Sequence, residues 1–296
     1  MDVNNGSSYK EIDTGKIYIF DAENKLWYEK KDNSGQPEIT VQPITITENG
    51  TVTAPAGTAY SPVTVKVPTG LNLKQYTEQG WTDANLSSTE ITKVRDYAFA
   101  SNESVVTANF TGVTDVGVYA FQGCTKLTTF DFSVVESIGA YAFNGCSALA
   151  PDVSLPNCTS LLDRAFMGCS SLVSFSAPKV TTIYHSALSS CTSLTSVSLP
   201  LVTVLNDWCL SANPMLKEVA LPSVTRMTRY ALARGGLEKL VLPGTTLCAI
   251  AGDTFQNTPI EKGTGYVYVP DDMVDSYKTA ANWSNIANQI KPISEL

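Results

Sequence analysis

Ala120-Phe-Gln-Gly-Cys-Thr-Lys-Leu127, Ala142-Phe-Asn-Gly-Cys-Ser-Ala-Leu149 and Ala165-Phe-Met-Gly-Cys-Ser-Ser-Leu172 are three versions of one eight-residue phrase, and they begin 22 or 23 residues apart. A chain segment of this length cannot bury its own apolar side chains. Copies that stack on one another bury all of them in a continuous interior. The phrase therefore predicts a solenoid built from repeated coils.

The period continues on both sides of these phrases and gives eight copies from Ile91 onward. The first column is an Ala-Phe pair or its equivalent: Ala98-Phe99, Ala120-Phe121, Ala142-Phe143, Ala165-Phe166, Ala187-Leu188, Cys209-Leu210, Ala231-Leu232 and Thr254-Phe255. The second lies five residues earlier: Val94, Val116, Ile138, Leu161, Ile183, Leu205, Met227 and Ile250. Two further columns hold Val105, Leu127, Leu149, Leu172, Leu194 and Leu216, and Pro156, Pro178, Pro200, Pro222 and Pro243.

Each coil also contains a strand pattern. The segment Leu194-Thr-Ser-Val-Ser-Leu199 alternates apolar and polar residues, and Pro200 follows where a ladder N–H is no longer needed. Eight such strands, spaced about 4.8 Å apart, would form a rod roughly 40 Å long. We predict a mainly β chain: a solenoid of eight coils of 22 to 23 residues sharing one parallel sheet, with small β modules before it and a strand and helix closing it.

A column of small polar or weakly polar residues lies three residues after the Phe position: Asn102, Cys124, Cys146, Cys169, Cys191 and Asn213. Amide and thiol groups can both satisfy the buried backbone of a turn. Together with the Ala-Phe-x-Gly-Cys-x-x-Leu phrases, this column resembles the BspA-type leucine-rich repeat of bacterial surface proteins over residues 91 to about 260. The resemblance implies an adhesin, a class that is usually exported.

Two small β modules precede the repeats. Tyr9 to Tyr28 holds aromatic and β-branched runs around turn residues, which predicts a hairpin or a three-stranded meander. Ile44 to Thr53 alternates around Asn49-Gly50, a strong hairpin signal, and Tyr60 to Val67 is expected to add a strand.

The first module also carries a second resemblance. Tyr9-Lys-Glu-Ile-Asp-Thr-Gly-Lys-Ile-Tyr-Ile-Phe-Asp21 is similar to modules that recur in structural proteins of phages infecting gut Firmicutes. This similarity implies attachment to a virion protein of the capsid, neck or tail. The implied attachment residues are Tyr9, Ile12, Ile17, Tyr18, Phe20 and Trp27.

We expect five parts along the chain: an attachment module (1–36), a hairpin linker module (37–70), an N-terminal cap (71–90), the solenoid (91–264) and a C-terminal cap (265–296). In the last part, Asp271 or Asp272 is expected to cap a helix. Its face toward the last coil is predicted to hold Val274, Tyr277, Ala281 and Ala287, with Trp283 to Ile290 completing the seal.

Composition narrows the function. A net charge of -8 argues against a nucleic-acid partner, because binding to phosphates depends on Lys and Arg. The sequence contains no apolar run long enough to insert into a membrane, and the Met1-Asp2-Val3 start has no basic and apolar leader, so we expect no secretion signal. Seven cysteines, four of them at the repeat interval and none in a CxxC pair, indicate buried thiols and predict neither disulfides nor a metal site.

The sequence predicts no catalytic residues, cofactor or metal. His185 has no repeating partner, and carboxylates such as Asp152 and Glu136 are scattered without a recurring offset, so a pair of acids for glycoside hydrolysis is missing. A phosphate loop is also absent.

Two surfaces are candidates for binding. An aromatic residue stands two positions before the Phe or Leu position in five of eight coils: Tyr97, Tyr119, Tyr141, Trp208 and Tyr230. We favour packing between coils as its role, and an exposed stripe for a sugar or a protein partner is the alternative. The second surface is the outer face of the sheet, represented by Thr128, Asp131, Thr195, Ser198, Lys217 and Glu238.

Three functional hypotheses follow. The first is a non-enzymatic phage appendage, a head or tail fibre docked by its N-terminal modules, with the solenoid presented to a cell-surface protein or glycan. A homotrimer would give the small N-terminal strands partners. The alternative is a bacterial cell-surface or secreted adhesin, which a leader upstream of Met1 would favour. The third, an enzyme built on the solenoid, would need clustered acids or a nucleophile.

Overall fold

A computed structural model of the protein describes residues 8–10, 17–21, 26–30, 45–46, 52–53, 85–88 and 91–296, with backbone pairing alone for the strands before Ile91. The chain divides into two compact units, one of Met1–Pro68 with Gln75–Trp81 and one of Thr69–Lys74 with Thr82–Leu296. Among the described residues, no helix has the length and apolar composition that a bilayer span requires.

The N-terminal unit contains the two expected β modules. β1 (Ser8–Lys10), β2 (Ile17–Asp21) and β3 (Leu26–Lys30) form an antiparallel sheet in that order, which confirms the meander. β4 (Thr45–Ile46) pairs antiparallel with β5 (Val52–Thr53), as the hairpin pattern predicts. The turn at Asn49-Gly50, the expected strand from Tyr60 to Val67 and Ile12 lie outside the described residues.

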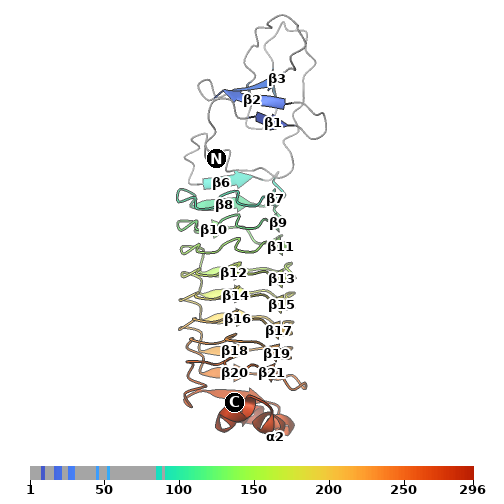
Figure 1. Ribbon diagram of the computed structural model, residues 1–296, viewed down its shortest axis with the longest axis vertical. Helices are drawn as coiled ribbons and strands as arrows, with labels where there is room; N and C mark the ends of the chain where they lie inside the picture. The colour runs from blue at the N-terminus through green and yellow to red at the C-terminus, as the bar shows by residue number, and fades with distance from the viewer. Residues whose placement is uncertain are drawn as a thin grey trace, which may run out of the picture. The chain divides into compact units, whose positions relative to one another are not determined.

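The second unit is the predicted parallel solenoid, and its main ladder runs through every coil (Figure 1). The repeat length sets the register: Val153 lies opposite Phe175, and Phe175 opposite Val197. The ladder consists of β6 (Asn85–Ser88), β8 (Thr107–Phe110), β10 (Thr129–Phe130), β12 (Asp152–Ser154), β14 (Ser174–Ser176), β16 (Ser196–Ser198), β18 (Glu218–Ala220), β20 (Lys239–Val241), β22 (Tyr266–Val269) and β23 (Ile290–Pro292).

The pairing in this ladder is interrupted twice, between β10 and β12 and between β16 and β18. The first interruption has a cause in the sequence. Four steps separate Leu149 from the inward Val153, whereas three separate Leu127 from Phe130, so the coil carries one extra residue beside Pro151. Nothing in the sequence marks the second interruption.

A second parallel ladder of two-residue strands runs beside the first (Figure 1), and its pairing is interrupted once, between Ile138 and Leu161. Its inward residues are the apolar column five before the Phe position, from Val94 to Ile250. The column is evident in the sequence, but its strands are not, because two residues are too few to show an alternating pattern. The ladder consists of β7 (Lys93–Val94), β9 (Asp115–Val116), β11 (Ser137–Ile138), β13 (Ser160–Leu161), β15 (Thr182–Ile183), β17 (Val204–Leu205), β19 (Arg226–Met227) and β21 (Ala249–Ile250).

The interior is a stack of like residues. Phe99, Phe121, Phe143 and Phe166 are at most 2% exposed, and their rings stack with centroids 4.8 to 5.3 Å apart. Burial of each ring contributes a few kcal/mol, and aromatic pairing adds about 1 kcal/mol. The repeat therefore obtains its stability from contacts between coils.

The Asn and Cys column joins the coils through hydrogen bonds, as the sequence analysis expected. The thiols of Cys124, Cys146, Cys169 and Cys191 each donate to the carbonyl oxygen of the Phe in the preceding coil, over 3.0 to 3.3 Å. Asn213 continues the column by donating its amide to Leu188 O at 3.0 Å. All seven cysteines are buried and unpaired with one another.

The C-terminal cap closes the last coil with β22, η1 (Asp271–Met273), α2 (Val274–Thr279), η2 (Trp283–Gln289), β23 and η3 (Ile293–Glu295). Trp283 is fully buried and donates its indole N–H to Cys248 O over 2.6 Å, while the Tyr277 hydroxyl accepts the Cys248 N–H. These contacts satisfy the backbone of the final turn.

Two details of the cap prediction are wrong. Neither Asp271 nor Asp272 caps a helix, because Pro270 stands at the N-cap and the Asp271 carboxylate accepts the Ser294 N–H instead. Ala281 is exposed, since α2 ends at Thr279 and a strained Asn282 follows with φ 65°.

Alkaline pH should weaken the fold through the buried thiols. Burial raises the pKa of Cys124, Cys191 and Cys248 to about 12, and it raises the pKa of Cys146 and Cys169 as well. Between about pH 9 and 12 the unfolded chain loses thiol protons that the folded chain keeps. The free energy of unfolding should therefore fall by roughly 1 kcal/mol per pH unit for each thiol.

Urea unfolding at pH 8 and pH 10 measures this slope. In the double variant Cys146→Ala, Cys169→Ala, the free energy of unfolding should fall less steeply with pH, because two of the buried thiols are missing. This difference in slope is expected whatever the stability of the variant at pH 8. If the double variant has the same slope as the wild type, the pH dependence of stability does not come from these thiols.

Loss of Trp283 should open the cap. The Trp283→Ala variant loses a fully buried ring that packs on Tyr277 at 5.0 Å and Phe255 at 5.7 Å, so we expect a loss of about 3–5 kcal/mol in stability. Hydrogen exchange of β22 and β23 should rise more than that of β14. Ser284→Ala, which alters an exposed neighbour, serves as the control.

Candidate functional site

The aromatic residues named from the sequence lie at the same corner turn in five of the coils, and each has a left-handed backbone. Their φ angles are 59° at Tyr97, 58° at Tyr119, 60° at Tyr141, 61° at Trp208 and 57° at Tyr230. This conformation costs a non-glycine residue about 1 kcal/mol or more. In four of the five residues it also directs the N–H to a carbonyl of the next coil; for example, Tyr97 donates to Val118 O over 2.9 Å and Tyr119 to Ala140 O over 3.0 Å.

The rings of this column stack on one another. Centroids lie 4.8 Å apart for Tyr97 and Tyr119, 4.6 Å for Tyr119 and Tyr141, and 4.1 Å for Trp208 and Tyr230, with planes within 22° of parallel. Rings therefore cover both faces of Tyr119 and one face of each of the other four residues, and Tyr97 at the end of the column is 53% exposed. These residues therefore pack between coils.

Arginine side chains pack on rings of the column, which forms two clusters. The Arg164 guanidinium lies 5.1 Å from the Tyr141 ring centre and donates to the Tyr141 hydroxyl. We call Tyr97, Tyr119, Tyr141 and Arg164 the N-terminal stack. Arg234 lies 4.9 Å from the Trp208 ring centre and Arg229 lies 5.3 Å from that of Tyr230. We call Trp208, Tyr230, Arg229 and Arg234 the C-terminal stack.

The aromatic stripe is interrupted between Tyr141 and Trp208. Ser186 occupies the same left-handed position with φ 54° and is 6% exposed, so the two stacks do not join. Asp253 ends the column and forms an ion pair with Arg229 at 3.0 Å. Its other oxygen, Oδ1, is buried without a hydrogen-bond partner in the described part of the chain.

Aspartates beside the column have a structural task. Asp96, Asp163 and Asp207 stand three residues before the Phe or Leu position, and each accepts the N–H of the residue at the equivalent position of the next coil over 2.7 to 3.1 Å. This recurring offset is not evident from the sequence alone, because five of the eight coils lack an acid there. These carboxylates are hydrogen-bond acceptors for backbone turns.

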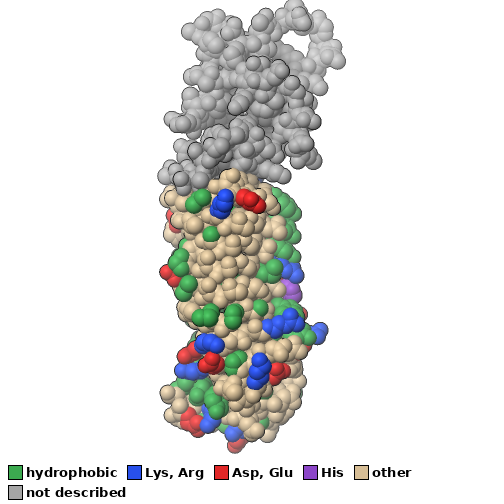
Figure 2. All heavy atoms as spheres, turned by 90° about the vertical axis from the view of Figure 1, so that its left-hand side faces the viewer, with side chains coloured by type: hydrophobic (Ala, Val, Ile, Leu, Met, Phe, Trp, Pro, Cys, Tyr) green, Lys and Arg blue, Asp and Glu red, His purple; other side chains and the backbone are tan. Residues whose placement is uncertain are grey.

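Phenol, guanidinium and carboxylate groups lie close together in and beside the stacks. Desolvation, then the neighbouring Tyr141 and Tyr97, raise the pKa of the Tyr119 phenol, which stays protonated near neutral pH. Asp253 raises the pKa of Arg229. Figure 2 shows one side of the molecule, on which Lys, Arg, Asp and Glu side chains gather over the C-terminal coils.

The residues proposed on the sheet face lie in and beside the main ladder. Ser198 belongs to β16 and is exposed. The hydroxyls of Thr128 and Thr195 donate to carbonyls of the preceding coil, and Asp131 accepts the Ser133 N–H. Lys217 and Glu238 form an exposed ion pair at 3.0 Å between neighbouring coils. Such pairs contribute little stability.

The proposed attachment residues fall on the N-terminal sheet. Tyr9 pairs with Tyr18 between β1 and β2, and Phe20 pairs with Trp27 between β2 and β3. Ile17 begins β2. Their role in attachment stays a prediction.

No three metal-ligating side chains come together within the residues that the structure describes. His185 is partly exposed, and its backbone N–H binds Asp163.

The fold and its outer surface define a class: a solenoid repeat protein with similar buried residues in every coil and with exposed turns and a sheet face that differ from coil to coil. A family model described as a BspA type leucine rich repeat region (6 copies) matches residues 75–150 and 136–261. The chain belongs to this family, as its repeat phrases predict.

Solved structures of related shape include a leucine-rich repeat protein from Bacteroides ovatus (19% identity, TM-score 0.47, covering 88% of this chain and 78% of the other). A leucine rich cell surface protein from Faecalibacterium prausnitzii (19%, 0.41, 90% and 76%) and a leucine rich repeat protein from T. pallidum (23%, 0.41, 56% and 88%) also match. No curated protein sequence matches the chain.

The N-terminal stack should stabilise the solenoid. Tyr119→Ser removes two ring pairs. Serine is compatible with the left-handed turn, because Ser186 occupies the equivalent position with φ 54°. We expect the free energy of unfolding, measured in urea, to fall by about 1–3 kcal/mol. Thr125→Ser, a change at an exposed turn of the same coil, is the control. An unchanged midpoint for Tyr119→Ser would show that the stack does not stabilise the coils.

Proposed function

We propose that this protein is a non-enzymatic binding protein of the adhesin type, placed on a bacterial cell surface, and that its C-terminal stack contacts a surface protein or glycan. Membership of the BspA-type family supports the class. One observation carries the site: the stack presents only Trp, Tyr and Arg side chains. These three residue types dominate the binding energy of protein interfaces.

The geometry of the C-terminal stack supports this role. Trp208 and Tyr230 are partly exposed and held by mutual stacking, so little conformational freedom is lost on binding. Arg234 packs on Trp208 without an ion-pair partner among residues 91–296, which leaves its charge available to a partner. Preorganised aromatic and guanidinium groups of this kind suit a polar partner surface.

Binding to cells or mucin tests the proposal. The double variant Trp208→Ser, Tyr230→Ser should weaken binding by about 30-fold or more, the loss expected of a hot spot, in biolayer interferometry with the full chain. Leu201→Ser, at an exposed apolar residue outside the stacks, is the matched control. Equal binding by wild type and the double variant would exclude this surface, and Ser198→Lys would then test the sheet face.

A virion appendage is the second candidate, and the N-terminal phrase from Tyr9 to Asp21 supports it. The chain would then be docked to a capsid, neck or tail through the β1–β3 sheet, with the solenoid presented outward. Immunogold imaging separates the two placements: label on phage particles supports the appendage, and label on bacterial envelopes supports the adhesin. Light scattering on the purified chain tests the homotrimer.

A further inference from the structure

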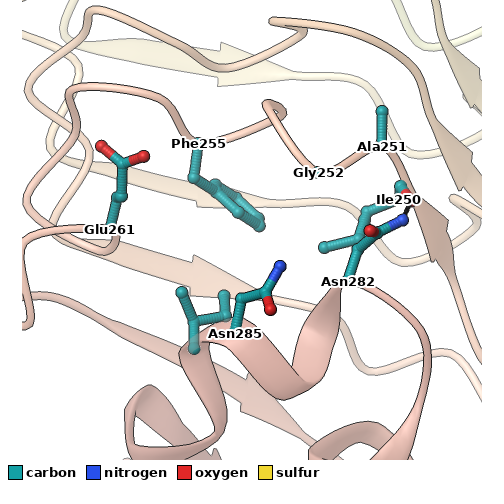
Figure 3. A pocket seen from close by; sticks show the side chains of 8 residues that line it. Ile250, Ala251, Gly252, Phe255, Glu261, Asn282 and Asn285 are labelled. Carbon is teal, nitrogen blue, oxygen red and sulfur yellow. Dashed lines mark hydrogen bonds between the residues drawn. The ribbon is translucent and has the colours of Figure 1, made fainter.

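A hollow of about 270 Å³ lies where the last coil meets the C-terminal cap (Figure 3). Ile250, Ala251, Gly252 and Phe255 line it from the coil, Asn282, Asn285 and Ile286 from the cap, and Glu261 from the turn between them. None of these residues belongs to the C-terminal stack. The hollow is slightly smaller than the sites that hold drug-sized ligands, which limits an occupant to one small molecule or one residue of a polymer.

Three polar side chains line the hollow, and hydrogen bonds hold two of them in place. Asn282 has a left-handed backbone (φ 65°) and donates its amide to Ile250 O over 2.7 Å, which fixes its oxygen beside Gly252. A Cβ at Gly252 would lie 3.3 Å from that oxygen, so glycine leaves the space open. One Glu261 oxygen accepts the Asn257 N–H over 2.6 Å, leaving the other for a ligand.

Asn285 is the third group. Its side chain points from η2 toward the Phe255 ring (Figure 3), and its amide forms no hydrogen bond within the described part of the chain. An amide offers both donors and an acceptor at this place. The wall behind it is apolar, since Phe255 is 5% and Ile286 is 7% exposed.

The side chains that line the hollow indicate which class of ligand it can hold. No Lys or Arg lines the hollow and one carboxylate does, which disfavours an anion. Two of the three polar groups are amides that both donate and accept, which suits hydroxyl groups better than an ammonium ion, a pure donor. The apolar wall suits a C–H face. A neutral sugar ring offers hydroxyls at its rim and C–H groups on its face.

We propose that this hollow binds one neutral sugar residue, with Asn285 and Glu261 as ligands to its hydroxyl groups and Ile250, Phe255 and Ile286 against its ring. The site gives the chain a second contact, for a terminal sugar, separate from the C-terminal stack. A ligand of this size in a partly open site should bind with a Kd on the order of 1 mM.

Saturation-transfer NMR and calorimetry with the full chain test this site, using glucose, galactose and N-acetylglucosamine as probes. At least one should bind saturably, and Asn285→Ala should weaken it about fivefold, the loss of one hydrogen bond. Ser284→Ala, an exposed neighbour that does not line the hollow, should bind like wild type. Thermal unfolding checks that each variant folds.

Two further probes separate a sugar from a charged ligand. Glucuronate and lysine should bind far more weakly than the neutral sugar, and Glu261→Gln should keep sugar binding within about threefold, because an amide replaces one hydroxyl acceptor with another. The proposal is overturned if none of the three sugars binds at about 50 mM, if Asn285→Ala binds like wild type, or if lysine binds best and Glu261→Gln abolishes it. Each of these outcomes leaves the test of the C-terminal stack unaffected.

Discussion

Backbone hydrogen bonding between coils is the constraint on which this structure depends. A coil of 22 or 23 residues has few carbonyl acceptors for its own N–H groups. The N–H groups at each corner therefore form hydrogen bonds with a neighbouring coil. Left-handed residues such as Tyr119 do this at one corner, and the thiol of Cys146 reinforces another by donating to Phe121 O. Order in one coil therefore depends on the coil that follows.

The same constraint explains why the surface can vary while the interior cannot. The left-handed corner accepts Tyr, Arg, Ser or Trp with φ between 53° and 61°, because its role is performed by the backbone. Its side chains are then free to form clusters such as the C-terminal stack. The buried Phe and Leu positions have no such freedom, since a gap there would remove contacts from two coils at once.

The proposed binding surfaces depend on this division between a fixed interior and a variable surface. Two clusters of aromatic and Arg residues repeat along one corner because the coils are in register, and the cap adds a polar hollow where the register ends at Gly252 and Asn282. A stack of coils supplies a repeated surface, and its closure supplies a unique one. Adhesion through several weak contacts is consistent with such a surface, since linked contacts raise the effective affinity.

The sequence by itself determined the coil length, the inward columns and the parallel ladder, because burial imposes a strict period that one sequence displays eight times. It also placed Tyr119 and Trp208 in one column. Only the tertiary structure decided that their ring faces are occupied, that Asp96 caps the next turn, and that Asn285 meets Phe255 across a hollow. These facts depend on side-chain direction and on contacts between distant residues, which no repeat period encodes.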